Sequence, residues 1–230
     1  MTFFRPAAVV LPLVLTGAIP AATQTAPAPS SHDATIHHSF REVDRWVKVF
    51  DDPHRDSWQK PSEVVSALGL RSGMIVADIG AGTGYFNQHL SRAVAPKGIV
   101  FAVDTEPEMV EHMGVRAVSE KTANVVPVLA LPENPFLPSG RVDRILIVDT
   151  YHHIDNRLVY FRRLKSTLAP GGRVAVIDYH KRPLPVGPPP EHKLERAFVV
   201  EEMKEAGWVL SDEKTFLPYQ YFLLFEPAGS

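Results

Sequence analysis

Five short apolar runs alternate with helical patterns along most of the chain, and this alternation limits the fold more than any other feature. The runs span residues 74–79, 98–103, 124–129, 142–148 and 173–178. Strands that are apolar on both faces are typical of a parallel sheet covered by helices on both sides. Between the runs, apolar residues recur at helical spacing, as at Leu158, Phe161, Leu164 and Leu168. The pattern therefore predicts a doubly wound α/β fold.

The C-terminal part of the chain follows a different pattern. A Pro-rich stretch, 181–190, precedes a helix expected from about Lys193 to Ala206, with Gly207 as its C-cap. Residues 208–216 and 219–225 then resemble two strands, and the connection between them is too short for a crossover helix. We therefore expect these two strands to pair antiparallel. The 230 residues, 45% of them hydrophobic and 22% charged, suit one folded domain.

The first 28 residues differ in composition from the rest and are predicted to be a signal peptide followed by an Ala/Pro-rich segment. Arg5 is the only charged residue before His32 and Asp33, and an apolar run follows it. That run is shorter than the ~20 apolar residues that a membrane span needs. We expect export to the periplasm, cleavage between about Ala21 and Ala28, and no stable membrane anchor after processing. The alternatives are a disordered tail and an uncleaved short anchor.

Residues 29–59 are predicted to form a linker and an N-terminal helical lid ahead of a main domain at 60–230. A helix is expected to begin at Phe40, because Phe40, Val43, Val47 and Phe50 fall on one helical face. The next segment is a polar-aromatic loop that is either a second wall of the functional site or a solvated connector. Its notable side chains are Arg55, Asp56, Trp58, Gln59 and Lys60.

A glycine-rich turn between the first strand and the next helix is the central functional signal. It reads Asp78-Ile79-Gly80-Ala81-Gly82-Thr83-Gly84-Tyr85. Glycines let a backbone turn tightly and approach a ligand closely, and the free N–H groups of the following helix suit a carboxylate or phosphate. A dinucleotide motif would place its third glycine at position 85, which is Tyr85 here. This spacing argues against a nicotinamide-dependent oxidoreductase, which stays open as an alternative.

The Asp-x-Gly-x-Gly-x-Gly form of this turn resembles the first motif of class I, Rossmann-like methyltransferases that depend on S-adenosylmethionine (SAM). Three further segments follow in that family's order, at 100–104, 142–149 and 168–174. The resemblance covers roughly residues 60–227. It implies a seven-stranded sheet of order 3-2-1-4-5-7-6 with strand 7 antiparallel. Residues 149–154 are similar to the region after strand four in small-molecule methyltransferases, including the ubiquinone/menaquinone type.

The resemblance also implies roles for individual residues. SAM would be the cofactor, with its methionine part cradled by Asp78, Gly80, Gly82 and Gly84. Asp104 would hold the ribose, with Thr105 nearby, and Asp149 would border the cofactor. The family commonly meets adenine with an acid after strand three; here Glu133 or Asn134 must serve, or the backbone alone.

Methyl transfer to a proton-bearing nucleophile needs a proton acceptor beside the tip of the fourth strand. The candidates are Asp149, Tyr151, His152 and His153. Histidine is favoured because its unperturbed pKa lies near neutrality, so we expect His152 or His153 to act. A non-catalytic SAM-binding protein on the same fold is the other alternative.

Composition narrows the range of partners. The net charge is −2 with both signs spread along the chain, which argues against nucleic acid and leaves a small-molecule substrate. The chain has no cysteine, so disulfides, thiolate zinc sites and cysteine nucleophiles are excluded. The spacing of the histidines matches no ligand pattern, and we expect no metal site.

Overall fold

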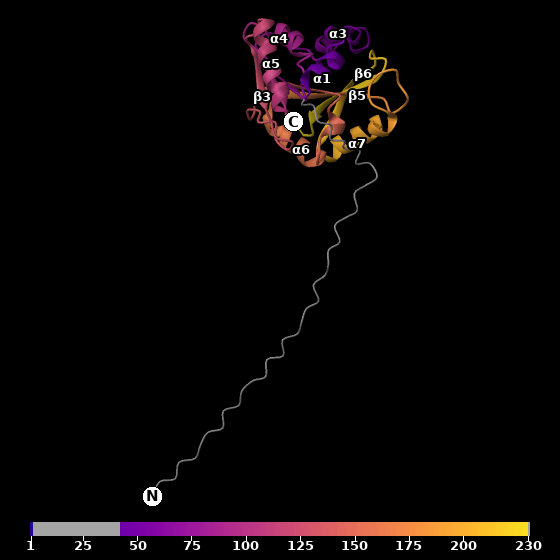
Figure 1. The fold of residues 1–230 in the computed structure, drawn as a ribbon. Coiled ribbons are helices and arrows are strands. Elements are labelled where there is room, and N and C mark those ends of the chain that lie inside the picture. Colours follow the sequence, from indigo (N-terminus) through magenta and orange to yellow (C-terminus); the bar gives the residue numbers. More distant parts are fainter. Residues whose placement is uncertain (2–41, 230) are drawn as a thin grey trace. The chain divides into compact units, whose positions relative to one another are not determined.

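The computed structural model describes Met1 and residues 42–229. The predicted signal peptide after Met1, the linker and Phe40 lie outside the described residues. Within 42–229, seven strands form one sheet in the order β3-β2-β1-β4-β5-β7-β6 (Figure 1). The strands are β1 (Ile75–Ile79), β2 (Ile99–Asp104), β3 (Val125–Leu129), β4 (Val142–Val148), β5 (Leu168–Tyr179), β6 (Trp208–Lys214) and β7 (Gln220–Pro227).

Strands β1 to β5 pair in parallel, and β7 runs antiparallel to both of its neighbours. The predicted strand order and the reversed last strand are therefore confirmed. The strongest sequence pattern, the apolar run of β4, matches its strand residue for residue.

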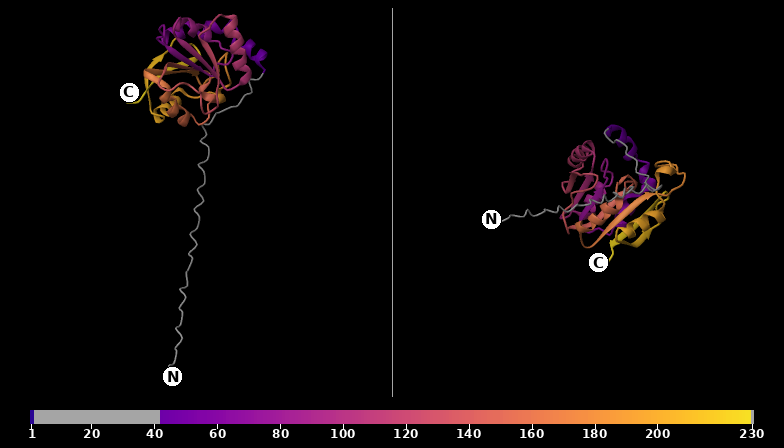
Figure 2. Two further views of the ribbon diagram at one scale, coloured as in Figure 1. Left: turned by 90° about the vertical axis from the view of Figure 1, so that its left-hand side faces the viewer. Right: turned by 90° about the horizontal axis from the view of Figure 1, so that it is seen from below.

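Helices cover both faces of the sheet, as the views in Figures 1 and 2 show. One apolar core joins the sheet to α3 (Pro61–Ala67), α4 (Asn87–Val94) and α5 (Pro107–Ser119). A second core joins its other face to α6 (Arg157–Leu164) and α7 (Arg196–Glu205). This two-sided burial explains why the central strands are almost continuously apolar.

The segment before α3 contains more helix than the sequence predicts. Helix α1 (Val43–Phe50) is followed by α2 (Arg55–Gln59), where we expected a loop. Lys60 then adopts a left-handed conformation with φ 49°, and Pro61 opens α3. A residue before proline avoids the right-handed helical region, so the chain must leave α2 at this point.

The boundary between α6 and β5 also differs from the prediction. The helix expected to reach Leu168 ends at Leu164, and a short 3-10 turn, η2 (Lys165–Thr167), follows it. Strand β5 begins at Leu168, and the pairing of β4 with β5 shifts register between Leu168 and Arg173. The Pro-Gly-Gly sequence therefore forms a bulge within the strand, with Gly171 at φ 74°.

The strand order reverses between β1 and β4, and in such sheets ligands bind beyond the carboxyl ends of the strands at this point.

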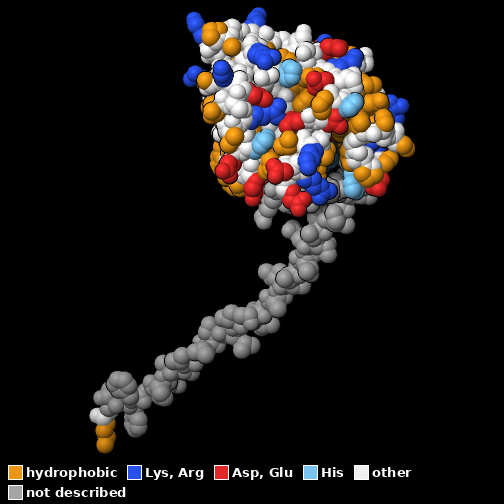
Figure 3. Space-filling view, turned by 45° about the horizontal axis from the view of Figure 1, so that its top comes forward, with side chains coloured by type: hydrophobic (Ala, Val, Ile, Leu, Met, Phe, Trp, Pro, Cys, Tyr) orange, Lys and Arg blue, Asp and Glu red, His pale blue; other side chains and the backbone are white. Residues whose placement is uncertain are grey.

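Acidic and basic side chains are mixed over the face of residues 42–229 seen in Figure 3. Within the described residues, none of the helices has the length and apolar character needed to cross a membrane.

Candidate active site

The three glycines of the turn after β1 all have positive φ, at 73° for Gly80, 56° for Gly82 and 83° for Gly84. The N–H groups of Gly80 and Ala81 both donate to the Val103 carbonyl, at 2.8 and 3.0 Å, which fixes the turn against β2. A Cβ atom at Gly80 would lie 2.3 Å from the Thr150 side chain, so the segment after β4 approaches too closely for any other residue. The turn is thus a rigid loop, here called the cradle, at the point between β1 and β4 where the strand order reverses.

Asp104, at the tip of β2, is fixed by the same turn. One carboxylate oxygen accepts the Gly82 N–H at 2.8 Å, and the other accepts the Glu106 N–H at 3.0 Å. Burial raises the pKa of Asp104, and these backbone donors lower it only in part. Thr105 is exposed beside it.

Asp78, at the end of β1, is 3% exposed and forms no hydrogen bond through its side chain within the described residues. Burial raises its pKa to about 7, with Arg55 lowering the value and Asp104 raising it. A buried carboxyl group without a hydrogen-bond donor is costly and is stabilised by a cationic ligand group. The cradle therefore fits SAM, whose methionine part carries an ammonium group for Asp78 and whose ribose hydroxyls suit Asp104.

The segment after β3 forms a tight turn closed by a bridge between Leu131 and Asn134. Glu133 and Asn134 are both exposed, and the Asn134 side-chain oxygen accepts the Phe136 N–H at 2.9 Å. The backbone joins this turn to the cradle, through Ala130 N–H donating to the Asp104 carbonyl at 2.8 Å. Within the described residues, neither predicted adenine side chain hydrogen-bonds the cradle.

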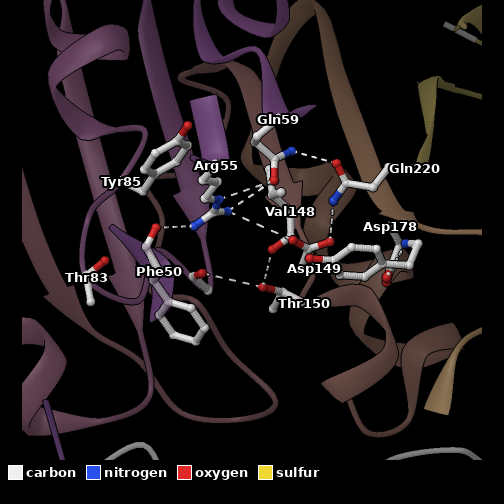
Figure 4. A network of polar contacts seen from close by, with 12 residues as sticks. Phe50, Arg55, Gln59, Thr83, Tyr85, Val148, Asp149, Thr150, Asp178 and Gln220 are labelled. Carbon is white, nitrogen blue, oxygen red and sulfur yellow. Dashed lines mark hydrogen bonds and ion pairs between the residues drawn. The ribbon is translucent and has the colours of Figure 1, made fainter. Parts of the chain in front are cut away.

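Asp149 lies directly after β4 and is the centre of a polar network (Figure 4). Its φ is 54°, and its N–H donates to the Ile177 carbonyl at 2.9 Å. Gln220 Nε2 donates to Asp149 Oδ1 at 2.6 Å, and Arg55 Nη2 lies 3.9 Å from Oδ2. Burial raises the pKa of Asp149 to about 7; Asp178 raises it further, while Arg55, His152 and the Gln220 bond lower it.

His152 lies in a short 3-10 turn, η1 (Tyr151–His153), and forms a buried pair with Asp178. His152 Nδ1 is 2.8 Å from Asp178 Oδ2, and the two residues are 3% and 0% exposed. Burial lowers the pKa of His152, but the charge and hydrogen bond of Asp178 outweigh it and raise the pKa overall. The half-buried His153 ring lies beside the His152 ring, with centroids 4.2 Å apart.

The Tyr151 side chain points away from the other three candidates. It is fully buried, and its hydroxyl donates to Glu202 Oε2 on α7 at 2.6 Å. Arg157 Nε donates to the same oxygen at 2.7 Å, and the Tyr151 ring stacks on Phe161. These contacts place Tyr151 in the core on the side of the sheet covered by α6 and α7.

Helices α1 and α2, which form part of the segment predicted as a lid, contact the glycine turn. A Cβ atom at Gly82 would lie 3.5 Å from the Phe50 ring. Arg55 lies 4.0 Å from the centre of the Tyr85 ring and donates to the Phe50 carbonyl at 2.8 Å. Thr83 donates to Asp51 at 3.1 Å, so polar contacts also join the end of α1 to the turn.

A basic cavity of about 300 Å³ opens after β5, next to the tip of that strand. Its lining is His180, Lys181, Arg182, Glu195 and Arg196.

No group of three or more His, Asp or Glu side chains within residues 42–229 could hold a metal ion.

Sequence reasoning missed Asp178 and Gln220 as members of the site. Asp178 had an available signal, because an acid near the end of the fifth strand must lie at the same sheet edge as Asp149. Gln220 gave a weaker signal, as one amide at the start of an apolar strand.

The strand order, the reversed β7 and the glycine turn at the switch point together define a Rossmann-like methyltransferase fold. A sequence profile described as a methyltransferase domain matches residues 76–172. The solved structure of a SAM-dependent methyltransferase from Aquifex aeolicus is similar, with a TM-score of 0.76, 28% identity, and coverage of 82% of this chain and 98% of that one. These findings support a class I methyltransferase.

Two further relatives extend the comparison. Demethylmenaquinone methyltransferase of Staphylococcus aureus is 27% identical over 155 residues, which are 66% of this chain and 63% of the relative. The chain thus spans less than two thirds of the length of these curated relatives. The DhpI complex with S-adenosylhomocysteine (SAH) shares the fold, with a TM-score of 0.65, 21% identity, and coverage of 87% of this chain and 97% of that one.

Proposed function

We propose that this protein transfers a methyl group from SAM to a small-molecule acceptor by SN2 displacement. The observation that carries the proposal is Asp78, a buried acid without a hydrogen-bond donor within the described residues, set in a glycine cradle of a methyltransferase fold. A cationic amino acid moiety is the ligand that such a cradle accommodates best. Asp104 beside it supplies the acid that ribose hydroxyls need.

SAM held by Asp78 and Asp104 would supply a methyl carbon activated by a sulfonium, whose sulfur would keep the electron pair of the carbon–sulfur bond. The protein's own residues position the partners and receive the proton that the acceptor loses. Asp149 and the His152–Asp178 pair are the groups at the β4 and β5 tips that can accept it. Positioning supplies much of the rate gain, and a proton acceptor typically adds about 10²–10⁴-fold.

Calorimetric titration of the purified protein with SAM, SAH and NAD tests the proposal directly. We expect SAM and SAH to bind and NAD to give no heat, because Asp78 and Asp104 suit the sulfonium nucleoside and Tyr85 replaces the dinucleotide glycine. Binding of NAD alone would instead favour the oxidoreductase.

The acceptor is tested with SAM carrying a tritiated methyl group and with demethylmenaquinone, first reduced chemically to its nucleophilic quinol, as the acceptor, since the Staphylococcus relative bears that name. Label in the extracted product supports this acceptor. SAM binding without transfer to any small-molecule acceptor offered would point to the non-catalytic binding protein.

We also propose export to the periplasm, based on the early Arg5, the apolar run and the Ala/Pro-rich segment. SAM is made inside cells, so export requires that SAM reach the envelope space. N-terminal sequencing of the native protein tests this, and we expect a first residue between about Ala22 and Pro29. An intact Met1 or Thr2 would refute processing.

A further inference from the structure

The side chains of Arg55, Gln59, Gln220 and Asp149 form one continuous hydrogen-bonded network, buried at its centre and partly exposed at its two ends, that joins α2, β7 and the tip of β4 (Figure 4). Gln59 is 0% exposed and Gln220 is 1% exposed. Buried amides are costly unless both their oxygen and their nitrogen find partners. Both amides meet this condition, because together they link α2 to Asp149 at the tip of β4.

Arg55 sets the direction of every hydrogen bond in this network. A guanidinium can only donate, so Gln59 must present its oxygen to Arg55 Nε and Nη2, each at 3.3 Å. Gln59 Nε2 therefore donates to Gln220 Oε1 at 2.7 Å, and Gln220 Nε2 must donate to Asp149 Oδ1 at 2.6 Å. The amide orientations follow from the chemistry of Arg55.

This order makes the two oxygens of Asp149 different. Oδ1 already accepts an amide N–H and is therefore the weaker base of the two, so a proton that reaches the carboxylate favours Oδ2. Oδ2 lies on the side of Arg55 Nη2, 3.9 Å away. Tyr179 also hydrogen-bonds Asp149, but a hydroxyl can rotate and accept as well as donate.

The backbone restrains the same residue. Asp149 holds a left-handed φ of 54°, which Asp and Asn tolerate better than other side chains, and its N–H is tied to β5. Strained residues of this kind persist where the surroundings over-determine them, often at functional sites. Backbone, amide and guanidinium thus restrict the carboxylate to one orientation.

We propose that Gln220 and Gln59 are positioning residues, which hold Asp149 so that its Oδ2 atom receives the proton lost by the methyl acceptor. This inference rests on the proposed function, because it names the atom that accepts the proton in that reaction. The bond that breaks is between the acceptor nucleophile and its hydrogen, and the bond that forms is O–H at Oδ2. The lid helix α2 takes part, since Arg55 and Gln59 begin the chain.

Removal of the two glutamine amides should change the pKa of Asp149. The groups that interact with Asp149 are Arg55 from α2, His152 from η1, Asp178 and Tyr179 from β5, and Gln220 and Tyr221 from β7. The Gln220 N–H stabilises the charged form, and its loss should raise the pKa of Asp149 above about 7. A merely structural role for Gln220 would leave that pKa unchanged.

The experiment compares the double variant Gln59→Leu/Gln220→Leu with the unmodified protein, using the ¹³C signal of the Asp149 carboxyl group in NMR titrations. The double variant removes both buried amides together, so neither is left unpaired, and we expect it to fold. We expect its Asp149 midpoint to rise by about one pH unit, since a hydrogen bond to a charged group has about that effect. Gln88→Leu, at a half-buried glutamine that has no side-chain hydrogen bond within the described residues, is the matched control and should leave the midpoint unchanged.

Transfer of the methyl group from SAM to demethylmenaquinone gives the second readout. The double variant should be at least fivefold slower than the unmodified protein at pH 7, and the difference should narrow at pH 9, where Asp149 is deprotonated in both. An unchanged NMR midpoint, or a rate loss equal at both pH values, overturns the proposal. Failure of the unmodified protein to bind SAM would contradict the proposed function instead. The NMR titration would still show whether Gln59 and Gln220 control the pKa of Asp149.

Discussion

Asparagine in place of Asp149 is expected to make the protein more stable and methyl transfer at least 100-fold slower. The asparagine side chain would keep the shape of the aspartate, accept the Gln220 N–H and tolerate the left-handed backbone. It carries no charge, so the cost of burying a carboxylate disappears together with the proton acceptor. Urea unfolding and tritium transfer from SAM to demethylmenaquinone measure the two effects.

The stability gain should depend on pH in a defined direction. The ordinary pKa of an aspartic acid, 3.8, applies in the unfolded chain, and burial raises the pKa of Asp149 to about 7 in the fold. The folded state therefore binds this proton more tightly, and the contribution of Asp149 to stability falls as pH rises from about 4 to 7. The advantage of Asp149→Asn should be near zero at pH 4 and reach on the order of 4 kcal/mol above pH 7.

A matched control separates this effect from a general loss of negative charge. Asp44 is an exposed acid on α1, and Asp44→Asn should leave the pH dependence of unfolding unchanged. A gain for Asp149→Asn that is equal at pH 4 and pH 8 would show that the Asp149 carboxyl is not strained by burial. If Asp149→Asn kept its activity within threefold of the unmodified protein, Asp149 would not be the proton acceptor.

The sequence could predict the sheet and the glycine turn at its switch point because both depend on local patterns. The apolar run of β4 and the glycines at 80, 82 and 84 each carry their structural meaning within a few residues. The strand order came from the resemblance to a known family, and the pairing of β5 with β7 bears it out. Acids at strand tips follow from the same reasoning, because parallel strands end at one edge.

The acceptor side of the site depends on contacts that no local pattern encodes. Gln59 and Gln220 are 161 positions apart and meet only because α2 packs over the end of β7. In η1, neighbouring residues diverge, so that Tyr151 turns into the core toward Glu202 while His152 turns toward Asp178. A one-turn 3-10 helix has no apolar periodicity that would reveal this division.

Alanine in place of Gly80 is expected to damage the cradle more than any other single methyl group added to the turn. The left-handed φ of 73° costs an alanine about 1–2 kcal/mol. The new Cβ atom would also lie 2.3 Å from Thr150 Cγ2 and Oγ1, and overpacking of this kind costs about 1–3 kcal/mol more. We expect the free energy of unfolding to fall by roughly 2–5 kcal/mol and SAM affinity to fall at least tenfold.

Two comparisons divide this loss into its causes. Gly140 has a similar φ of 66° with nothing within 4 Å of an added Cβ atom, so Gly140→Ala should show the backbone strain alone and leave SAM binding intact. Thr150→Gly removes the clashing atoms, and the double variant Gly80→Ala/Thr150→Gly should recover the packing part of the loss. If Gly80→Ala were no less stable than Gly140→Ala and bound SAM as tightly as the unmodified protein does, the turn would not be the cofactor site. The close approach of Thr150 to Gly80 is therefore the contact on which the shape of the cradle depends, because it joins the turn after β1 to the segment that carries Asp149.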